Sequence, residues 1–274
     1  MKITTKIAAL FAIFAPLAPA HASEEEGSGA ITVAGSAAIA TDYRFRGVSQ
    51  SDKRMAVQGG LTLAHDSGVY VGIWASNLAG WGTFGGSNME LDLIGGYRTR
   101  LSDKATIDIG FTWYMYPGGA DNTDFAEPYV KVSGVAGPAT VTAGVAYAPR
   151  QYALANVSNA PDSRGQKQDN IYLWTDGTLP IAGTPLTAKA HLGYSDGNPG
   201  LGPNGTSLAP TGTYWDWSLG MDATWRNLTL NLSYVDTDIA KSDAALLQPN
   251  FSKGQDGHGS IAGSAVVASL TAAF

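Results

Sequence analysis

The stretch MELDLIGGYRTRL, residues 89–101, alternates charged with apolar or small side chains along much of its length. Glu90 and Asp92 stand two residues apart, and so do Arg98 and Arg100. Because successive side chains of an extended chain leave the backbone on opposite faces, this spacing predicts a β-strand with one charged face and one apolar face. Such a strand separates two different environments.

The composition of the whole chain favours an all-β protein. Its 274 residues include 34 glycines, 10% aromatic residues and only 15% charged residues, and the sequence has no long stretch of helical periodicity. The chain has no cysteine, which excludes disulfides, thiolate catalysis and cysteine-ligated zinc. A net charge of -6 without a basic stripe argues against nucleic acid as a partner.

The N-terminus has the pattern of an exported protein. An apolar run flanked by lysines ends before the small-x-small sequence AHA at 20–22, which is typical of a signal-peptide cleavage site. We expect a signal peptide at 1–22, a periplasmic leader at 23–29 and one domain at 30–274. The apolar run is shorter than the roughly 20 residues that a membrane-spanning helix needs.

The same alternation recurs along the rest of the chain. In ATIDIGFTWYMY, residues 105–116, Ile107, Ile109 and Phe111 alternate with polar or small residues such as Asp108. Twelve segments of this kind are predicted as strands. They are 30–46, 55–66, 68–79, 88–101, 105–117, 125–136, 139–149, 168–179, 185–196, 214–225, 228–238 and 263–274.

The connections between these strands alternate strictly between short and long. Tight turns such as DSG, SDK and RN are followed each time by a longer link such as GWGTFGGS. Tight periplasmic turns and long outward loops are typical of an outer-membrane barrel. A closed barrel also leaves no backbone group unpaired in hydrocarbon. We therefore predict an all-β, up-and-down antiparallel transmembrane barrel of about twelve strands, with both termini on the short-turn side.

Aromatic residues gather near the strand ends, as expected for two belts at the membrane interfaces. The belt at the long-loop ends is predicted to be the heavier one. The predicted long-loop set is Tyr43, Phe45, Trp74, Trp113, Tyr116, Phe125, Tyr129, Tyr147, Tyr172, Trp174, Tyr194, Trp215, Trp217 and Tyr234, and the short-turn set is Tyr70, Tyr97, Trp225 and Phe274.

Four motifs in the first third of the chain resemble a known family. They are DYRFRGVSQ at 42–50, VQGGL at 57–61, YVGIWASN at 70–77 and the E-x-D of Glu90 and Asp92. Together they resemble the TorF family of Gram-negative bacterial porins. The resemblance implies an outer-membrane barrel that forms a pore, without an assigned substrate or catalytic residues. The terminal Phe274 is similar to the aromatic residue by which the barrel-assembly machinery recognises its clients.

The polar face of each strand is predicted to line the lumen. Arg44 and Arg46 on the first strand, with Glu90 and Asp92 on the fourth, could line a constriction or pair with each other as internal struts. Other candidates could likewise contact a solute or form internal ion pairs. These further candidates are Arg98, Arg100, Asp108, Glu127, Lys131, Lys189, His191, Asp216 and Asp222.

Whether the lumen is open depends on what fills it. Many inward positions are small, among them Gly110, Gly144 and Gly193, and small residues leave room for water. A plug would need bulkier residues or a folded loop, which the last long loop could supply. The sequence therefore predicts a porin-like channel for small hydrophilic solutes or ions. The alternative is a closed barrel that acts in surface adhesion or recognition through its long loops.

An enzymatic function is weighed against these two. Twelve-stranded outer-membrane phospholipases carry a Ser, His and Asn set on the lipid-facing wall. Here His191 is on the polar face of its strand, with Ser195 and Asn170 as conceivable partners, and no nucleophile elbow is present. We expect no catalytic residue, no cofactor and no metal site. The expected partners are outer-membrane lipid, the barrel-assembly machinery and small solutes.

Overall fold

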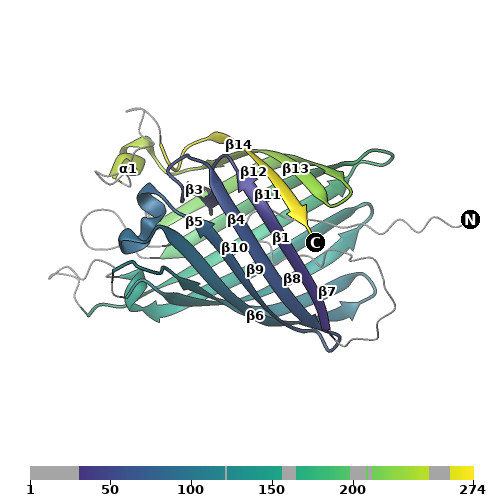
Figure 1. Cartoon of the computed structure of the whole chain (residues 1–274), viewed down its shortest axis with the longest axis horizontal. Helices are drawn as coiled ribbons and strands as arrows, with labels where there is room; N and C mark the ends of the chain where they lie inside the picture. Colours follow the sequence, from purple (N-terminus) through teal and green to yellow (C-terminus); the bar gives the residue numbers. More distant parts are fainter. Residues whose placement is uncertain (1–30, 121, 156–164, 198–207, 209–211, 247–259) are drawn as a thin grey trace, which may run out of the picture.

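A computed structural model of the chain forms a closed barrel of twelve antiparallel strands (Figure 1). The structure describes residues 31–274 except 121, 156–164, 198–207, 209–211 and 247–259. The predicted signal peptide and leader lie outside the described residues. The barrel strands are β1 (Ile31–Ala40), β4 (Ala56–His65), β5 (Val69–Asn77), β6 (Met89–Ser102), β7 (Ala105–Met115), β8 (Phe125–Ala136), β9 (Ala139–Gln151), β10 (Gln168–Pro180), β11 (Leu186–Gly197), β12 (Thr213–Trp225), β13 (Leu228–Thr237) and β14 (Ala265–Ala273).

The topology is up-and-down, which confirms the predicted fold class. From β4 to β14 each strand pairs with its neighbours in the sequence, and β1 pairs with β4 on one side and β14 on the other. The closing pair places Ala38 opposite Thr271. Because the ring is complete, the barrel has no open sheet edge.

The strand boundaries agree with the predicted ones to within two residues at each end, with one exception. The first strand was expected at 30–46, but β1 ends at Ala40. Residues 41–55 instead form a separate segment that contains a small hairpin of β2 (Arg44–Phe45) and β3 (Val48–Ser49). We call residues 41–55 the inward segment.

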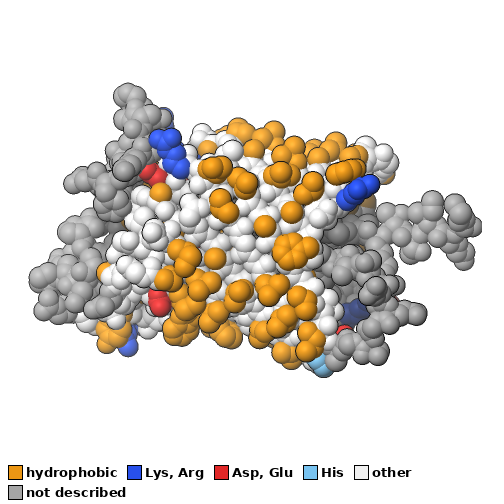
Figure 2. All heavy atoms as spheres, in the orientation of Figure 1, with side chains coloured by type: hydrophobic (Ala, Val, Ile, Leu, Met, Phe, Trp, Pro, Cys, Tyr) orange, Lys and Arg blue, Asp and Glu red, His pale blue; other side chains and the backbone are white. Residues whose placement is uncertain are grey.

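The two faces of the wall differ as the alternation predicts. On β7, Ile109, Phe111 and Trp113 are exposed on the outside, whereas Asp108 and Thr112 are buried inside. Figure 2 shows apolar side chains spread over the middle of the outer surface, with the charged ones near the two ends. Such a continuous apolar wall is suited to contact with hydrocarbon rather than water.

The two ends of the barrel carry different connections. At one end, turns of two to five residues join the strands; at the other lie η1 (Gly80–Gly86), η2 (Tyr152–Leu154) and α1 (Lys241–Leu246) (Figure 1). None of the helices in the described ranges is long and apolar enough to cross a membrane. The start of β1 and the end of β14 lie at the short-turn end, where Phe274 and Gly35 exchange two backbone hydrogen bonds.

The aromatic belts are only partly as predicted. Trp113, Tyr147, Trp215 and Tyr234 are exposed near the long-loop ends, and Tyr97, Trp225 and Phe274 near the short turns. Other predicted belt members point into the barrel instead, where they are buried. These inward residues include Tyr43, Tyr70, Tyr116, Phe125 and Tyr172. The residues at inward positions of the pleat pack the lumen rather than anchor the membrane interface.

Candidate functional site

The inward face of the wall carries eleven of the thirteen charged or titratable residues singled out from the sequence. All except Arg100, which is exposed near the short-turn end, are buried or half-buried. They come from β6 (Glu90, Asp92, Arg98, Arg100), β7 (Asp108), β8 (Glu127, Lys131), β11 (Lys189, His191) and β12 (Asp216, Asp222).

The other two, Arg44 and Arg46, are not on a wall strand as predicted but on the inward segment. Its hairpin turns at Arg46 and Gly47, whose φ angles are +48° and +79°. A two-residue hairpin turn with positive φ at both positions follows the twist of the flanking strands. A side chain at Gly47 would also overlap Thr237 and Asp216 on the wall. The turn therefore lies close against the inner surface of the barrel.

The carboxylate of Asp42 holds the hairpin together. It accepts hydrogen bonds from Arg44 Nε at 2.6 Å, Ser49 Oγ at 2.6 Å and Ser51 Oγ at 3.1 Å. Arg44 Nη1 in turn donates a hydrogen bond to the carbonyl of Ile261 at 2.8 Å. These bonds tie the inward segment to the last long connection, and they leave Arg44 paired with Asp42 rather than with β6.

Arg46 reaches across the lumen. Its Nη2 donates hydrogen bonds to both carboxylate oxygens of Glu127 at 2.7 Å. Its guanidinium lies 4.0 Å from the ring centroid of Tyr172. Burial by itself would lower the pKa of Arg46, but the Glu127 carboxylate, Tyr114 and Tyr172 together raise it, so the guanidinium stays charged. Glu127 is on β8, nearly opposite β1 and β4 in the ring, so the inward segment spans the barrel.

The arginines of the inward segment do not pair with Glu90 or Asp92. Glu90 accepts a hydrogen bond from the hydroxyl of Tyr43 at 3.1 Å. Asp92 is buried on the wall beside it. The four residues therefore do not pair with each other as internal struts, because Arg44 pairs with Asp42 and Arg46 with Glu127. That they line a constriction stays a prediction.

Two clusters of apolar side chains pack around the inward segment in the outer half of the lumen. One cluster packs Tyr43 of the inward segment against wall and loop residues, and a second packs Val48 of the same segment against Tyr214 and the last long connection. The segment that packs into the outer lumen is therefore mainly the first long connection, with Ile261 and Ala262 of the last one contributing. The first cluster is Tyr43, Ala56, Leu78, Tyr114, Tyr116, Phe125, Ala148, Ala153, Leu154 and Leu208.

The small inward residues do not simply leave room for water. Tyr70, Gly96, Gly110 and Tyr129 occupy one row across β5 to β8. The two rings lie over the two glycines, and their hydroxyls hydrogen-bond to each other. The ring of Trp174 covers Gly144 in the same way. Glycine thus gives aromatic rings a place to lie against the wall.

His191 lies between two carboxylates near the middle of the barrel. Its Nδ1 is 2.6 Å from Asp176, and its Nε2 is 3.1 Å from Asp216 and 2.9 Å from the hydroxyl of Tyr172. This set faces the lumen, not the lipid. Neither Ser195 nor Asn170 contributes to it, so the conceivable Ser, His and Asn set is not assembled.

Two groups of opposite charges lie closer to the short turns. The carboxylate of Asp108 accepts hydrogen bonds from Arg98 Nη2 at 2.8 Å and from the Tyr70 hydroxyl at 2.6 Å, and Lys131 Nζ is 3.5 Å away. Lys189 Nζ is 3.3 Å from Asp222, which also accepts from Asn231 at 2.6 Å. This half of the lumen is polar and partly open to water.

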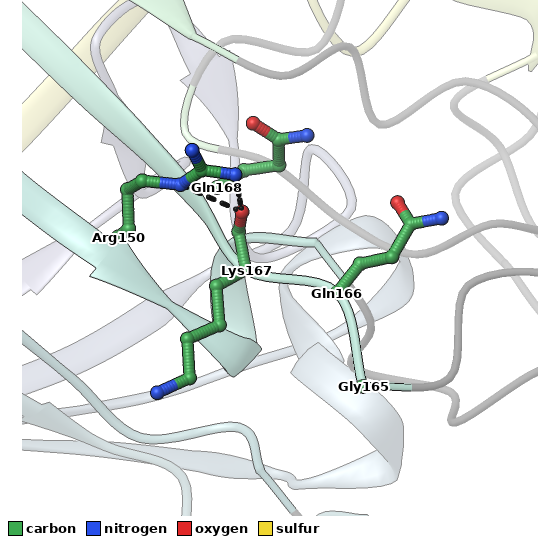
Figure 3. A pocket seen from close by; sticks show the side chains of 5 residues that line it. All are labelled: Arg150, Gly165, Gln166, Lys167 and Gln168. Atoms are coloured by element: carbon green, nitrogen blue, oxygen red, sulfur yellow. Dashed lines mark hydrogen bonds between the residues drawn. The ribbon is translucent and has the colours of Figure 1, made fainter.

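A separate pocket of about 460 Å³ lies between the ends of β9 and β10. Arg150, Gly165, Gln166, Lys167 and Gln168 line it, and Figure 3 shows the guanidinium of Arg150 turned toward the carbonyl of Lys167. It includes none of the lumen residues above.

Sequence reasoning missed the residues that build the plug. Asp42, Ser49 and Ser51 hold the hairpin, and Tyr172 and Tyr214 receive it. The signal was the glycine in YRFRGVS, a tight-turn residue in the middle of a segment assigned partly to a strand.

Three comparisons relate the chain to known proteins. The model of a family described as "Bacterial protein of unknown function (Gcw_chp)" matches residues 24–274. No curated protein matches the chain. The specific resemblance to the TorF family is not confirmed.

Solved structures of low identity have a similar outline. A porin is 12% identical with a TM-score of 0.40, over 80% of this chain and 62% of that one. The outer membrane channel DcaP of Acinetobacter baumannii is 11% identical with a TM-score of 0.41, over 89% and 97%. A loop-deletion mutant of OmpT, an outer membrane protein of Vibrio cholerae, is 10% identical with a TM-score of 0.42, over 90% and 100%. The chain thus spans less than two thirds of the first.

Proposed function

The chain belongs to the Gcw_chp family of bacterial proteins of unknown function, and we propose that it is a narrow outer-membrane channel for the passive diffusion of small hydrophilic solutes or ions. One observation carries this proposal. An apolar outer wall surrounds a lumen whose inner half carries charged side chains that are partly exposed to water. Charged side chains that line a water-exposed interior are how pores select small ions.

The inward segment would set the size of the passage. It spans the barrel between β1 and β8, where the Arg46–Glu127 pair fixes it. Because the clusters around Tyr43 and Val48 are closely packed, we expect a small conductance and a steep size limit. The inward segment is then the constriction of the channel.

The location and partners are part of the same proposal. The signal pattern at 1–22 and the resemblance to TorF porins support export to the outer membrane of a Gram-negative cell. The terminal Phe274 would be the contact for the barrel-assembly machinery, and the apolar wall would contact outer-membrane lipid. Passive diffusion needs no cofactor and no energy source.

Single-channel recording tests the channel. The mature protein, refolded in detergent and inserted into a planar bilayer, should give small, stepwise currents in KCl. A tight seal without steps, at several voltages and salt concentrations, would refute the proposal.

The second candidate is a closed barrel that acts through its outer loops. The packing of the outer lumen favours it, because both apolar clusters lie where a solute would enter. Under this alternative, deleting 241–260 removes binding of a surface ligand while the bilayer stays sealed with either protein. Stepwise currents from the wild type would exclude it.

A further inference from the structure

The inner half of the lumen presents a particular sign of charge to water. We define the inner vestibule by the groups of opposite charge nearest the short turns: Arg98, Lys131 and Asp108 on one side, and Lys189 and Asp222 on the other. The numbers of acids and bases in the sequence do not show which side chain of each group is exposed to water. The structure shows this through the exposure of each side chain.

In both groups the cation is the more exposed partner. The side chains of Arg98 and Lys131 are 36% and 13% exposed, against 5% for Asp108. Lys189 is 12% exposed, against 6% for Asp222. The carboxylates lie at the wall, and the longer basic side chains lie between them and the water. A solute in the vestibule therefore meets positive charge first.

The carboxylates are also occupied by donors of the wall. One oxygen of Asp108 accepts a hydrogen bond from Arg98 and lies near Lys131, and the other accepts a hydrogen bond from Tyr70. Two cations therefore share this single carboxylate. Asn231 donates to Asp222 in addition to the neighbouring Lys189.

The remaining acids of the lumen do not reverse this sign. Glu90 and Asp92 are 3% and 1% exposed, and Glu127 is paired with Arg46. The half-buried Asp176 and the buried Asp216 are both in contact with His191. Between the level of Asp176 and His191 and the short turns, the inward charges of the described wall strands are four basic residues against two carboxylates. They are Arg98, Arg100, Lys131 and Lys189 against Asp108 and Asp222.

We infer that the inner vestibule makes the passage selective for small anions, with Arg98, Lys131 and Lys189 as the residues that determine this preference. The inference rests on the proposed channel function. A narrow cleft lined by one sign of charge with low-dielectric walls raises the local concentration of the opposite ion. Because all three cations are partly exposed in this structure, the preference does not require a change of structure.

The test is the reversal potential of single channels in a tenfold KCl gradient. We expect the wild type to favour chloride over potassium by several-fold. Removing the charge in Lys131→Gln and Lys189→Gln should bring that ratio toward one, and the double variant should favour potassium. Lys241→Gln is the matched control, because it removes one positive charge from an exposed side chain of α1 at the opposite end.

The outcomes are distinct. Channels that favour potassium, or that show no preference, overturn the inference and leave the proposed channel standing. The same follows if the Lys131 and Lys189 variants keep the wild-type ratio. A bilayer that stays sealed overturns both. The wild-type measurement decides the sign on its own, so a variant that fails to fold does not remove the test.

Discussion

The Arg46–Glu127 pair is the most informative single perturbation. Both side chains are almost fully buried, at 5% and 4% exposure, and two oxygens of Glu127 accept from the same guanidinium at 2.7 Å. Glu127→Gln keeps the size of the side chain and removes its charge. The guanidinium then remains buried beside Tyr172 without a counter-charge.

The magnitude follows from the burial. Removing one partner of a buried ion pair costs about 3–5 kcal/mol. The glutamine oxygen can still accept a hydrogen bond, so we expect a value near about 3 kcal/mol. This loss of stability affects the docking of the inward segment, because the hydrogen bonds between the barrel strands do not depend on the Arg46–Glu127 pair. At a factor of ten per roughly 1.4 kcal/mol, the equilibrium between docked and released segment shifts by about a hundredfold.

Two assays follow that shift. Single-channel records of Glu127→Gln should show larger or fluctuating currents, because the constriction is released for part of the time. Limited trypsin digestion should cut after Arg44 or Arg46, which are buried in the wild type. The control is Arg46→Met with Glu127→Met, since replacing a buried pair by apolar residues is often neutral. It should retain the wild-type current and protease resistance.

The reasoning is refuted if Glu127→Gln has wild-type currents and the same cleavage pattern while remaining folded. The inward segment would then be held by Asp42 and the apolar clusters alone. Larger currents in the double Met variant, equal to those of Glu127→Gln, would show that apolar side chains cannot replace the hydrogen-bonded pair.

Three further predictions concern the wall and the lumen. Leu219→Arg places a charge on the lipid face in the middle of β12, where Leu219 is 63% exposed. Its free energy of unfolding, measured by urea titration in vesicles, should fall by about 2–4 kcal/mol. Gly144→Ala pushes a methyl group into the ring of Trp174 and should cost about 1–3 kcal/mol in the same titration, whereas Gly177→Ala, whose Cβ meets open space, should be close to neutral. No esterase activity is expected from the wild type, and activity that disappeared in His191→Ala would restore the hydrolase hypothesis.

Most of the barrel was predictable because its signals are local. Alternation along β7 and β12 sets the inward and outward faces, and the hairpin turns fix which strands are neighbours. The same alternation failed at Arg44 and Arg46, because a polar residue at every second position fits a wall strand and a hairpin inside the lumen equally well. What separates the two is the contact between Arg46 and Glu127, 81 residues apart.

The aromatic residues illustrate a signal that was present but overridden. Tyr114 stands in the polar set of its strand, in phase with Asp108, and Tyr172 is in phase with Asp176. The pleat of each strand therefore places the ring on the same face as the aspartate. The predicted aromatic belt instead placed the Tyr172 ring at the membrane interface. In the structure the ring is buried inside the barrel, as the pleat requires.

Side-chain length connects the wall to the sign of the vestibule. The acids of the inner vestibule are aspartates, whose carboxylates stay near the strand, and their partners are Lys131, Lys189 and Arg98, whose long stems carry the charge toward the water. Paired opposite charges on a concave wall are thus not neutral to a solute in the lumen, because the longer side chain is the more exposed one. The pair of Arg46 and Glu127 differs, because both of its side chains are long and neither charge reaches water. The sequence contains these lengths, but only the register places each long side chain over its short partner.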